Sequence, residues 1–206
     1  MKTPGYENGF ELTLHPERLN QPKLRKKPTV YFVNSMSDLF HPDVPDDFID
    51  KVIQVIQETP QHTYQVLTKR AERLPDFFEF RRVPENMWLG VSVEDTKYGK
   101  PRIDLLKKVR AATRFLSIEP LIEDIGSINL NGIHWVIVGG ESGHYARPME
   151  ESWVQSIKEQ CIRAHVPFFF KQWGTWSKDG LRKNKKANGR TLDGKLWDNY
   201  PSSLNI

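Results

Sequence analysis

The sequence contains a single cysteine, Cys161, among its 206 residues. A disulfide within the chain is therefore excluded, and so is a zinc knuckle or a cysteine-held iron–sulfur cluster built from this chain alone. No stretch approaches 18 consecutive apolar residues, so no segment is predicted to cross a membrane. The N-terminus also lacks an apolar core of signal-peptide length, and a lone free thiol suits a reducing compartment. We therefore expect a cytoplasmic protein with no membrane contact.

Several nucleotide-binding and hydrolase motifs are also missing. No Gly-x-Gly-x-x-Gly follows the first predicted strand, which disfavours a dinucleotide-binding fold. Neither a Gly-x-Ser-x-Gly elbow nor a phosphate-binding loop is present, which disfavours the common hydrolase and NTPase classes. The histidines show no metal-ligand spacing such as His-Glu-x-x-His, so we expect no metal site.

Six short apolar segments, rich in β-branched and aromatic residues, recur along the chain. Near-continuous apolar runs of this length are typical of parallel strands that are buried on both faces. The predicted strands are residues 29–33, 63–67, 87–93, 114–118, 134–138 and 167–170.

Apolar residues at helical spacing occur between most of these segments. One such stretch starts at Pro45, which suits a first helical position, and is stopped by Pro60. The others are residues 69–78, 102–110 and 151–164. Cys161 lies on the apolar face of the last one, so we interpret it as a core residue rather than as a reactive thiol.

The alternation of strands and helices predicts an α/β protein. The spacing of the strands fits either a (βα) barrel or an open doubly wound sheet. We divide the chain into an N-terminal lead-in at residues 1–28, a strand-and-helix domain at residues 29–175 and a short irregular C-terminal extension at residues 176–206. The extension is polar and basic and carries Asp-Gly pairs, which favour a hairpin or a mobile tail.

Polar or charged residues follow every predicted strand. In α/β folds such residues gather at the carboxyl edge of the sheet, where ligands bind. The mouth formed there would hold glutamates facing basic residues, namely Glu94, Glu119 and Glu141 with Lys69, Arg70 and Lys171. The three glutamates are candidate acid–base catalysts. Candidate cofactor-binding residues are Asn34, Ser35, Lys69, Ser92, Gly139, Gly140, Glu141, Lys171 and Gln172.

Two local features sharpen this candidate site. The glycine pair Gly139-Gly140 lets the backbone approach a ligand closely and expose amide donors, and the adjacent Glu141 could take an amine or a ribose hydroxyl. Pro120 restrains Glu119 to an extended conformation and so fixes where its carboxylate leaves the strand.

The net charge is +4, and many of the basic residues are clustered. One cluster precedes the first predicted strand, and the other lies in the C-terminal extension. Such clusters form either solvated loops or a contact surface for a polyanion. Trp173 and Trp176 are candidates for stacking on a base or ring. Candidate nucleic-acid-binding residues are Trp173, Lys183, Lys185 and Lys186.

A family resemblance rests on several stretches of the sequence. These are GFELTLHPERLNQP, VYFVNSMSDLFHPDVP, HTYQVLTKRAERL, NMWLGVSVE, RFLSIEPLI, HWVIVGGESGHYARPM and VPFFFKQWG. Over residues 9–174 the chain resembles the phage gene-product-thirty-seven/sixty-eight family, a group of phage and bacterial proteins of unknown function. The tail GRTLDGKLWDNYP resembles the family as well.

Members of that family resemble radical S-adenosylmethionine enzymes. Complete members usually start with a tryptophan-rich strand and a three-cysteine segment, whose thiolates hold a [4Fe–4S] cluster that leaves one iron for S-adenosylmethionine. This sequence opens near the stretch that follows those cysteines. The resemblance therefore implies an incomplete, TIM-like (βα) barrel over residues 29–175, with S-adenosylmethionine as its cofactor. In radical enzymes a Gly-Gly-Glu turn typically contacts the methionine amine of S-adenosylmethionine. Here the same three residue types occur at residues 139–141, on the fifth predicted strand and not near the strand that would carry the cluster.

Three functions remain open from the sequence. The first is a radical-enzyme-like protein that is truncated or partner-dependent, and catalytic only if cysteines come from elsewhere. The second is a non-catalytic module that binds a nucleotide or nucleic acid. The third is an acid–base enzyme that uses the strand-end glutamates. A missing first unit would leave an open barrel edge, which we expect a partner chain or a second copy to cover.

Overall fold

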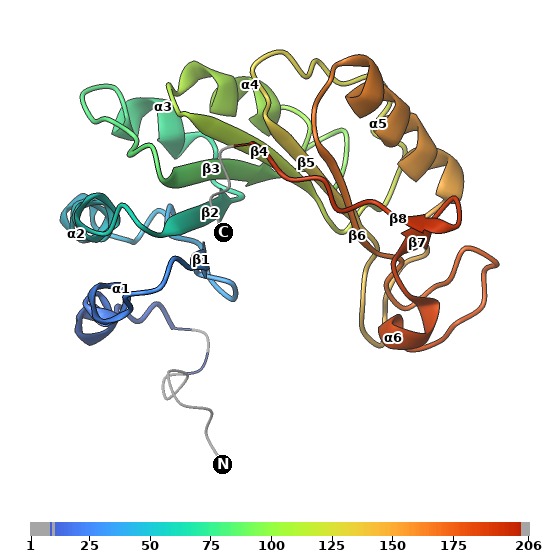
Figure 1. Ribbon diagram of the computed structural model, residues 1–206, viewed down its shortest axis with the longest axis horizontal. Helices are drawn as coiled ribbons and strands as arrows, with labels where there is room; N and C mark the ends of the chain where they lie inside the picture. The colour runs from blue at the N-terminus through green and yellow to red at the C-terminus, as the bar shows by residue number, and fades with distance from the viewer. Residues whose placement is uncertain (1–8, 10, 203–206) are drawn as a thin grey trace.

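The computed structural model describes residue 9 and residues 11–202, and its centre is a sheet of parallel strands that curls into a half-barrel (Figure 1). The strands are hydrogen-bonded in chain order, each parallel to the next. They are β1 (Val30–Val33), β2 (Thr63–Thr68), β3 (Met87–Ser92), β4 (Thr113–Ile118), β5 (Trp135–Gly139) and β6 (Phe168–Gln172). Each lies within two residues of its predicted segment, and the predicted α/β class is confirmed.

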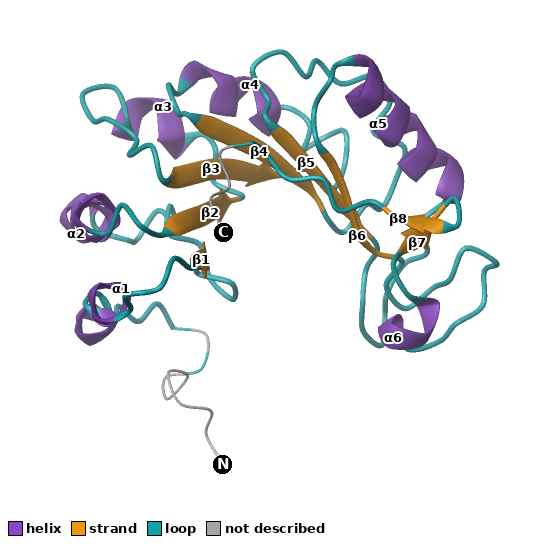
Figure 2. Cartoon of the chain, viewed as in Figure 1, coloured by secondary structure: helices purple, strands orange, loops and turns teal. Residues whose placement is uncertain are grey.

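Helices cover the convex side of the sheet (Figure 2). They are α2 (Asp46–Glu58), α3 (Arg73–Phe77), α4 (Arg102–Lys108) and α5 (Glu151–Arg163). Shorter elements are a 3-10 helix (Pro16–Arg18), α1 (Gln21–Leu24) and α6 (Lys185–Asn188). Within the part of the chain that the structure describes, no helix has the length and apolarity needed to span a membrane.

Helix α3 begins later than the predicted helix at residues 69–78. The Asp38 carboxylate accepts a hydrogen bond from the backbone amide of Lys69 at 2.8 Å, and the hydroxyl of Thr68 accepts one from the amide of Arg70 at 2.8 Å. These side chains satisfy amides that would otherwise open a helix, so they hold the chain in a turn at the end of β2.

The main hydrophobic core lies between the sheet and the helices. Alternate strand residues point into it because successive side chains of a strand face opposite sides of the sheet. Val66, Leu89 and Val138 are fully buried there. Cys161 of α5 is also fully buried in this core, and its burial raises the pKa of the thiol to about 12. The prediction that Cys161 is a core residue is confirmed.

The concave side of the sheet carries a second group of packed rings. We call it the inner aromatic cluster, and its members are Trp88, Phe115, Trp135 and Phe169. These rings come from the first half of their strands, so the cluster forms the floor of the half-barrel. The strand ends beyond it form the mouth.

The chain's own C-terminal residues cover this floor. After the last hairpin they run along the inner side of the sheet, in red in Figure 1. The indole N–H of Trp135 donates to the carbonyl of Asn199 at 2.9 Å, and the ring of Tyr200 lies 5.2 Å from the Trp135 ring. The amide of Phe170 donates to the carbonyl of Trp197 at 2.9 Å, so the same segment also pairs with the outer edge of β6.

The predicted hairpin of the C-terminal extension is present. It consists of β7 (Thr191–Leu192) and β8 (Lys195–Leu196), which pair antiparallel. The turn residues Asp193 and Gly194 have φ values of +54° and +74°, and two positive values in succession suit the type I′ turn that Asp-Gly favours.

Candidate functional site

The carboxyl edge of the sheet carries an ion pair that spans two strands. Glu119 follows β4, and its Oε2 lies 2.9 Å from Nζ of Lys171 on β6, while its Oε1 accepts a hydrogen bond from Nε2 of Gln172 at 3.1 Å. The strand between them, β5, has Gly139 at this level. A Cβ there would lie 3.0 Å from the Glu119 carboxyl group, so the missing side chain lets Glu119 reach across. The structure thus brings four predicted site residues together.

A second ion pair lies at the ends of β2 and β3. The carboxylate of Glu94 pairs with Lys69 and accepts a hydrogen bond from Arg102 of α4 at 2.9 Å. The same guanidinium donates to the backbone carbonyl of Ser92 at 2.8 Å. Ser92 itself is buried, so in this structure it supports Arg102 through its backbone.

A third pair is local to the loop after β5. The guanidinium of Arg147 donates to both carboxylate oxygens of Glu141, at 2.8 and 2.9 Å, and its backbone amide donates to the same carboxylate at 2.8 Å. These bonds favour the charged form and lower the pKa of Glu141 to about 2. Glu141 is therefore ionised at neutral pH, which does not suit a general acid.

The three pairs share one arrangement. The carboxylates are sheltered, with 12–25% of each side chain exposed, whereas the cations Lys69, Arg147 and Lys171 are 53–56% exposed. Solvent therefore meets cationic groups at the mouth, held in place by carboxylates beneath them. We call these three side chains the cationic rim.

The second glycine of the pair, Gly140, is required by close packing of the backbone. A Cβ on Gly140 would lie 1.9 Å from the backbone carbonyl oxygen of Trp173, and no side chain fits there. The expected close approach of the backbone at Gly139-Gly140 is real, but in this structure its partners are the side chain of Glu119 and the chain that leaves β6 rather than a ligand.

The end of β1 is organised by a residue that sequence reasoning passed over. Asp38 accepts a hydrogen bond from the hydroxyl of Thr68 at 2.7 Å in addition to the Lys69 amide, and so ties the β1 loop to the end of β2. Its bond from the amide of Phe40 at 3.0 Å is an Asx turn, a local signal that was available in the sequence. Asn34 bonds within its own turn, to Ser37 at 2.8 Å, and Asn34 and Ser35 are exposed.

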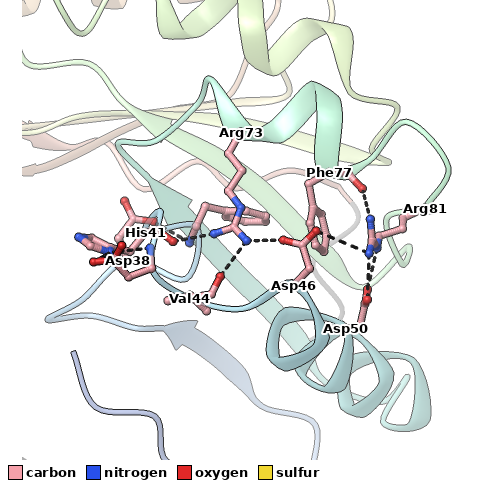
Figure 3. Close-up of polar contacts among 10 residues, drawn as sticks. Asp38, His41, Val44, Asp46, Asp50, Arg73, Phe77 and Arg81 are labelled. Atoms are coloured by element: carbon pink, nitrogen blue, oxygen red, sulfur yellow. Dashed lines mark hydrogen bonds and ion pairs between the residues drawn. The ribbon is translucent and has the colours of Figure 1, made fainter.

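Further along, the same loop is fastened to α3 (Figure 3). The guanidinium of Arg73 donates to the carbonyls of His41 and Val44 at 2.6 and 2.8 Å and pairs with Asp46 at the start of α2. Arg81 makes a two-pronged bond to Asp50 of α2, at 2.8 and 3.0 Å. These contacts are structural. They hold the β1–α2 connection and helix α2 in place, and they involve none of the ion pairs at the mouth.

The predicted stacking residues are used internally. Trp173 is 2% exposed, and its indole N–H donates to the carbonyl of Thr191 at 2.9 Å. The indole N–H of Trp176 donates to the carbonyl of Ala146 at 2.6 Å. The Trp173 ring is therefore no open platform for a base, because it is packed into the core. Trp176 is half-buried and holds the loop after β5.

Two of the predicted basic residues of the extension, Lys183 and Lys186, are exposed. Lys183 has 45% of its side chain exposed and lies 3.7 Å from Asp179. Lys186 is exposed. The side chain of Lys185 lies outside the described part of the structure. None of the described contacts joins these lysines to the cationic rim.

The residues present do not fit an iron–sulfur cluster. Such a cluster needs several thiolates, and the one cysteine is buried in the outer core with a raised pKa. Among the described residues, no group of three or more histidine, cysteine or acidic side chains is placed to hold a metal ion.

Comparisons with known proteins identify a family for this chain. A family described as a protein of unknown function, DUF5131, matches residues 1–201 of the sequence. The chain belongs to DUF5131. The DUF5131 match spans the half-barrel, its strand-end loops and the C-terminal segment on the inner face. No curated protein and no solved structure matches the chain.

Proposed function

We propose that this chain binds a small molecule carrying both an amino and a carboxylate group at the mouth of the half-barrel, and that S-adenosylmethionine is its representative. The observation that carries the proposal is the Glu119–Lys171 pair, with Glu94–Lys69 beside it on neighbouring strand ends. Each pair offers one acceptor for an ammonium group and one half-exposed donor for a carboxylate. The resemblance to radical S-adenosylmethionine proteins supports the choice of ligand.

The energetics favour exchange of partners at these pairs. Ion pairs whose cation is half-exposed contribute only about 0–1 kcal/mol, because water solvates the ammonium group almost as well as the carboxylate does. A zwitterionic ligand that supplies both charges therefore replaces the internal pair at low cost. The mouth lies at the carboxyl ends of parallel strands, where α/β folds bind ligands.

Binding rather than radical chemistry is the role proposed for this chain alone. These 206 residues do not supply the thiolates of a cluster, so a radical reaction would need cysteines from elsewhere. The acid–base alternative loses Glu141 as its general acid, because Arg147 holds that carboxylate ionised. Kinship with the phage gene-product-thirty-seven/sixty-eight group and a cytoplasmic location remain part of the proposal.

The test is isothermal titration calorimetry with S-adenosylmethionine and S-adenosylhomocysteine. We expect one site per chain, and we expect Lys171→Met to weaken it at least fivefold. Lys51→Met is the matched control, because Lys51 is 58% exposed and lies 3.4 Å from Asp47 on the outer helix α2. Absence of binding at millimolar ligand, or equal affinity of Lys171→Met and wild type, would overturn the proposal.

We also propose that a second copy of the chain pairs with the outer edge of β1. Among the described residues β1 has a strand partner on one side only, and Val30 and Phe32 are 37% and 45% exposed. An edge of this kind invites pairing, and a twofold axis would let two identical edges pair with each other. Sedimentation equilibrium should show a monomer–dimer equilibrium that Phe32→Lys abolishes and Phe80→Lys does not. A wild-type monomer at all concentrations would contradict it.

A further inference from the structure

Beyond the small-molecule site, we propose that the loops around the mouth bind single-stranded nucleic acid. Bases would stack on Tyr98 and Tyr145, and phosphates would contact the basic side chains beside them. This surface differs from the one that the sequence suggested, since Trp173 and Trp176 take no part. It is also independent of the zwitterion site, so either proposal can fail without the other.

The two tyrosines are exposed on loops that follow strands. Tyr98 follows β3 and is 62% exposed, and Tyr145 follows β5 and is 90% exposed. Both loops therefore open at the carboxyl edge of the sheet. Large rings that are this exposed on two loops of one edge favour a partner with flat apolar faces.

Hydrogen bonds fasten the backbone of both loops, so the tyrosines leave the chain at fixed positions. The carboxylate of Asp95 accepts hydrogen bonds from the backbone amides of Tyr98 and Gly99, at 2.5 and 3.0 Å. The loop with Tyr145 is closed by the bonds between Glu141 and Arg147. A preformed loop costs less ordering entropy on binding than a mobile one.

Basic side chains lie beside both rings. Nζ of Lys97 lies 4.8 Å from the centre of the Tyr98 ring. The guanidinium of Arg182 donates to the carbonyl of His144, which brings the basic C-terminal extension next to Tyr145. Arg147 is 56% exposed in the same loop.

The two loops belong to one surface. The segment after β4 joins the strand ends from which these loops depart. The amide of Leu121 donates to the carbonyl of Gly139 at the end of β5 at 3.0 Å, and the amide of Ile122 donates to the carbonyl of Glu94 beyond the end of β3 at 3.4 Å. Aromatic rings interleaved with cations, and with the acidic groups of the rim already paired, match the way proteins bind single strands without sequence preference.

Single strands fit this surface better than duplexes do. In a duplex the faces of the bases are stacked on each other and closed to protein rings, whereas every base of a single strand offers a face. The two tyrosines lie on separate loops, with the end of β4 between them, so they do not form the continuous apolar core that a protein partner requires.

The experiment is fluorescence anisotropy with a labelled 20-nucleotide thymidine oligomer and with a duplex of the same length, at about 50 mM salt. We expect Tyr98→Ser and Tyr145→Ser each to weaken single-strand binding at least fivefold, consistent with the loss of one stacked base. We expect a log–log salt slope of about −3, as for about four phosphate contacts. Phe80→Ser is the control, because Phe80 is 90% exposed on the connection that enters β3 at the opposite edge of the sheet.

Circular dichroism and thermal melting would first establish that each variant is folded. Tyrosine variants that bind the oligomer as wild type does would overturn the proposal, as would tighter binding of the duplex or no binding at low salt. Calorimetry with S-adenosylmethionine on the tyrosine variants separates the two sites. Loss of oligomer binding with unchanged S-adenosylmethionine binding is the expected pattern.

Discussion

The pair formed by Glu141 and Arg147 gives a stability prediction with a defined pH window. The pKa of Glu141 falls from an ordinary 4.5 to about 2 on folding, chiefly through hydrogen bonds from Arg147. At 1.36 kcal/mol for each pKa unit this shift corresponds to at most about 3 kcal/mol. Because Arg147 is 56% exposed, solvent screens the pair, and we expect about 1–2 kcal/mol.

The perturbation is Glu141→Gln, which keeps the size of the side chain and removes its charge. A carboxylate with a lowered pKa stabilises the fold fully above 4.5 and loses that contribution as the pH falls toward about 2. Urea unfolding followed by circular dichroism should therefore show wild type about 1–2 kcal/mol more stable than the variant at pH 7. The gap should shrink by more than half by about pH 3.

The control for this prediction is a double-mutant cycle with Arg147→Met. If the pair carries the effect, adding Arg147→Met to Glu141→Gln should cost little more than either single change. A gap between wild type and Glu141→Gln that stays constant from pH 7 to about 3 would refute the reasoning. So would a carboxyl pKa near 4.5 for Glu141 measured directly by NMR.

Three further predictions concern packing. Gly140→Ala should lower the free energy of unfolding in urea by about 2–3 kcal/mol, because the new Cβ would lie 1.9 Å from the Trp173 carbonyl oxygen. Gly189→Ala is the control and should cost about 1 kcal/mol, because Gly189 has open space around it but a φ of +69°. Equal costs for the two variants would contradict this prediction. Cys161 should react with a thiol reagent only after denaturation, since its pKa is raised to about 12 by burial, and fast labelling of the folded chain would count against it. Tyr200→Ala should cost about 1–2 kcal/mol and shift tryptophan emission to longer wavelength by wetting the inner aromatic cluster, and an unchanged spectrum would speak against the covering role of the C-terminal segment.

The fold could be predicted because its signals are local. Each strand is a short apolar run, and each break between runs is marked by a change of period or by proline, as at Pro45 and Pro60. Helix α3 is shorter than predicted because its start depends on a distant contact. The Asp38 carboxylate that holds the end of β2 lies 31 positions away in sequence.

The candidate site was predictable in its place but not in its pairing. Topology alone puts residues that follow parallel strands at one edge of the sheet. The bond between Glu119 and Lys171 depends on Gly139 lying between them on β5, and a single sequence does not reveal that strand order. Nothing in the sequence indicated that Arg147, six positions further along, would form an ion pair with Glu141.

The burial of Trp173 could not be settled from the sequence, because it depends on a distant segment. Trp173 follows a strand end exactly as a mouth residue would, yet the hairpin strand with Thr191 packs over it. The segment that covers the inner aromatic cluster is polar in sequence, and only the contacts of Asn199 and Tyr200 with Trp135 show its role.

The central claim, a ligand site at the mouth of the half-barrel, is tested most directly by an NMR titration of the ¹⁵N-labelled chain with S-adenosylhomocysteine. Backbone amide shifts should change with ligand at the strand ends around Lys69, Glu119 and Lys171, and the helices on the convex side should stay unchanged. Shifts confined to the convex helices, or none at millimolar ligand, would contradict the account.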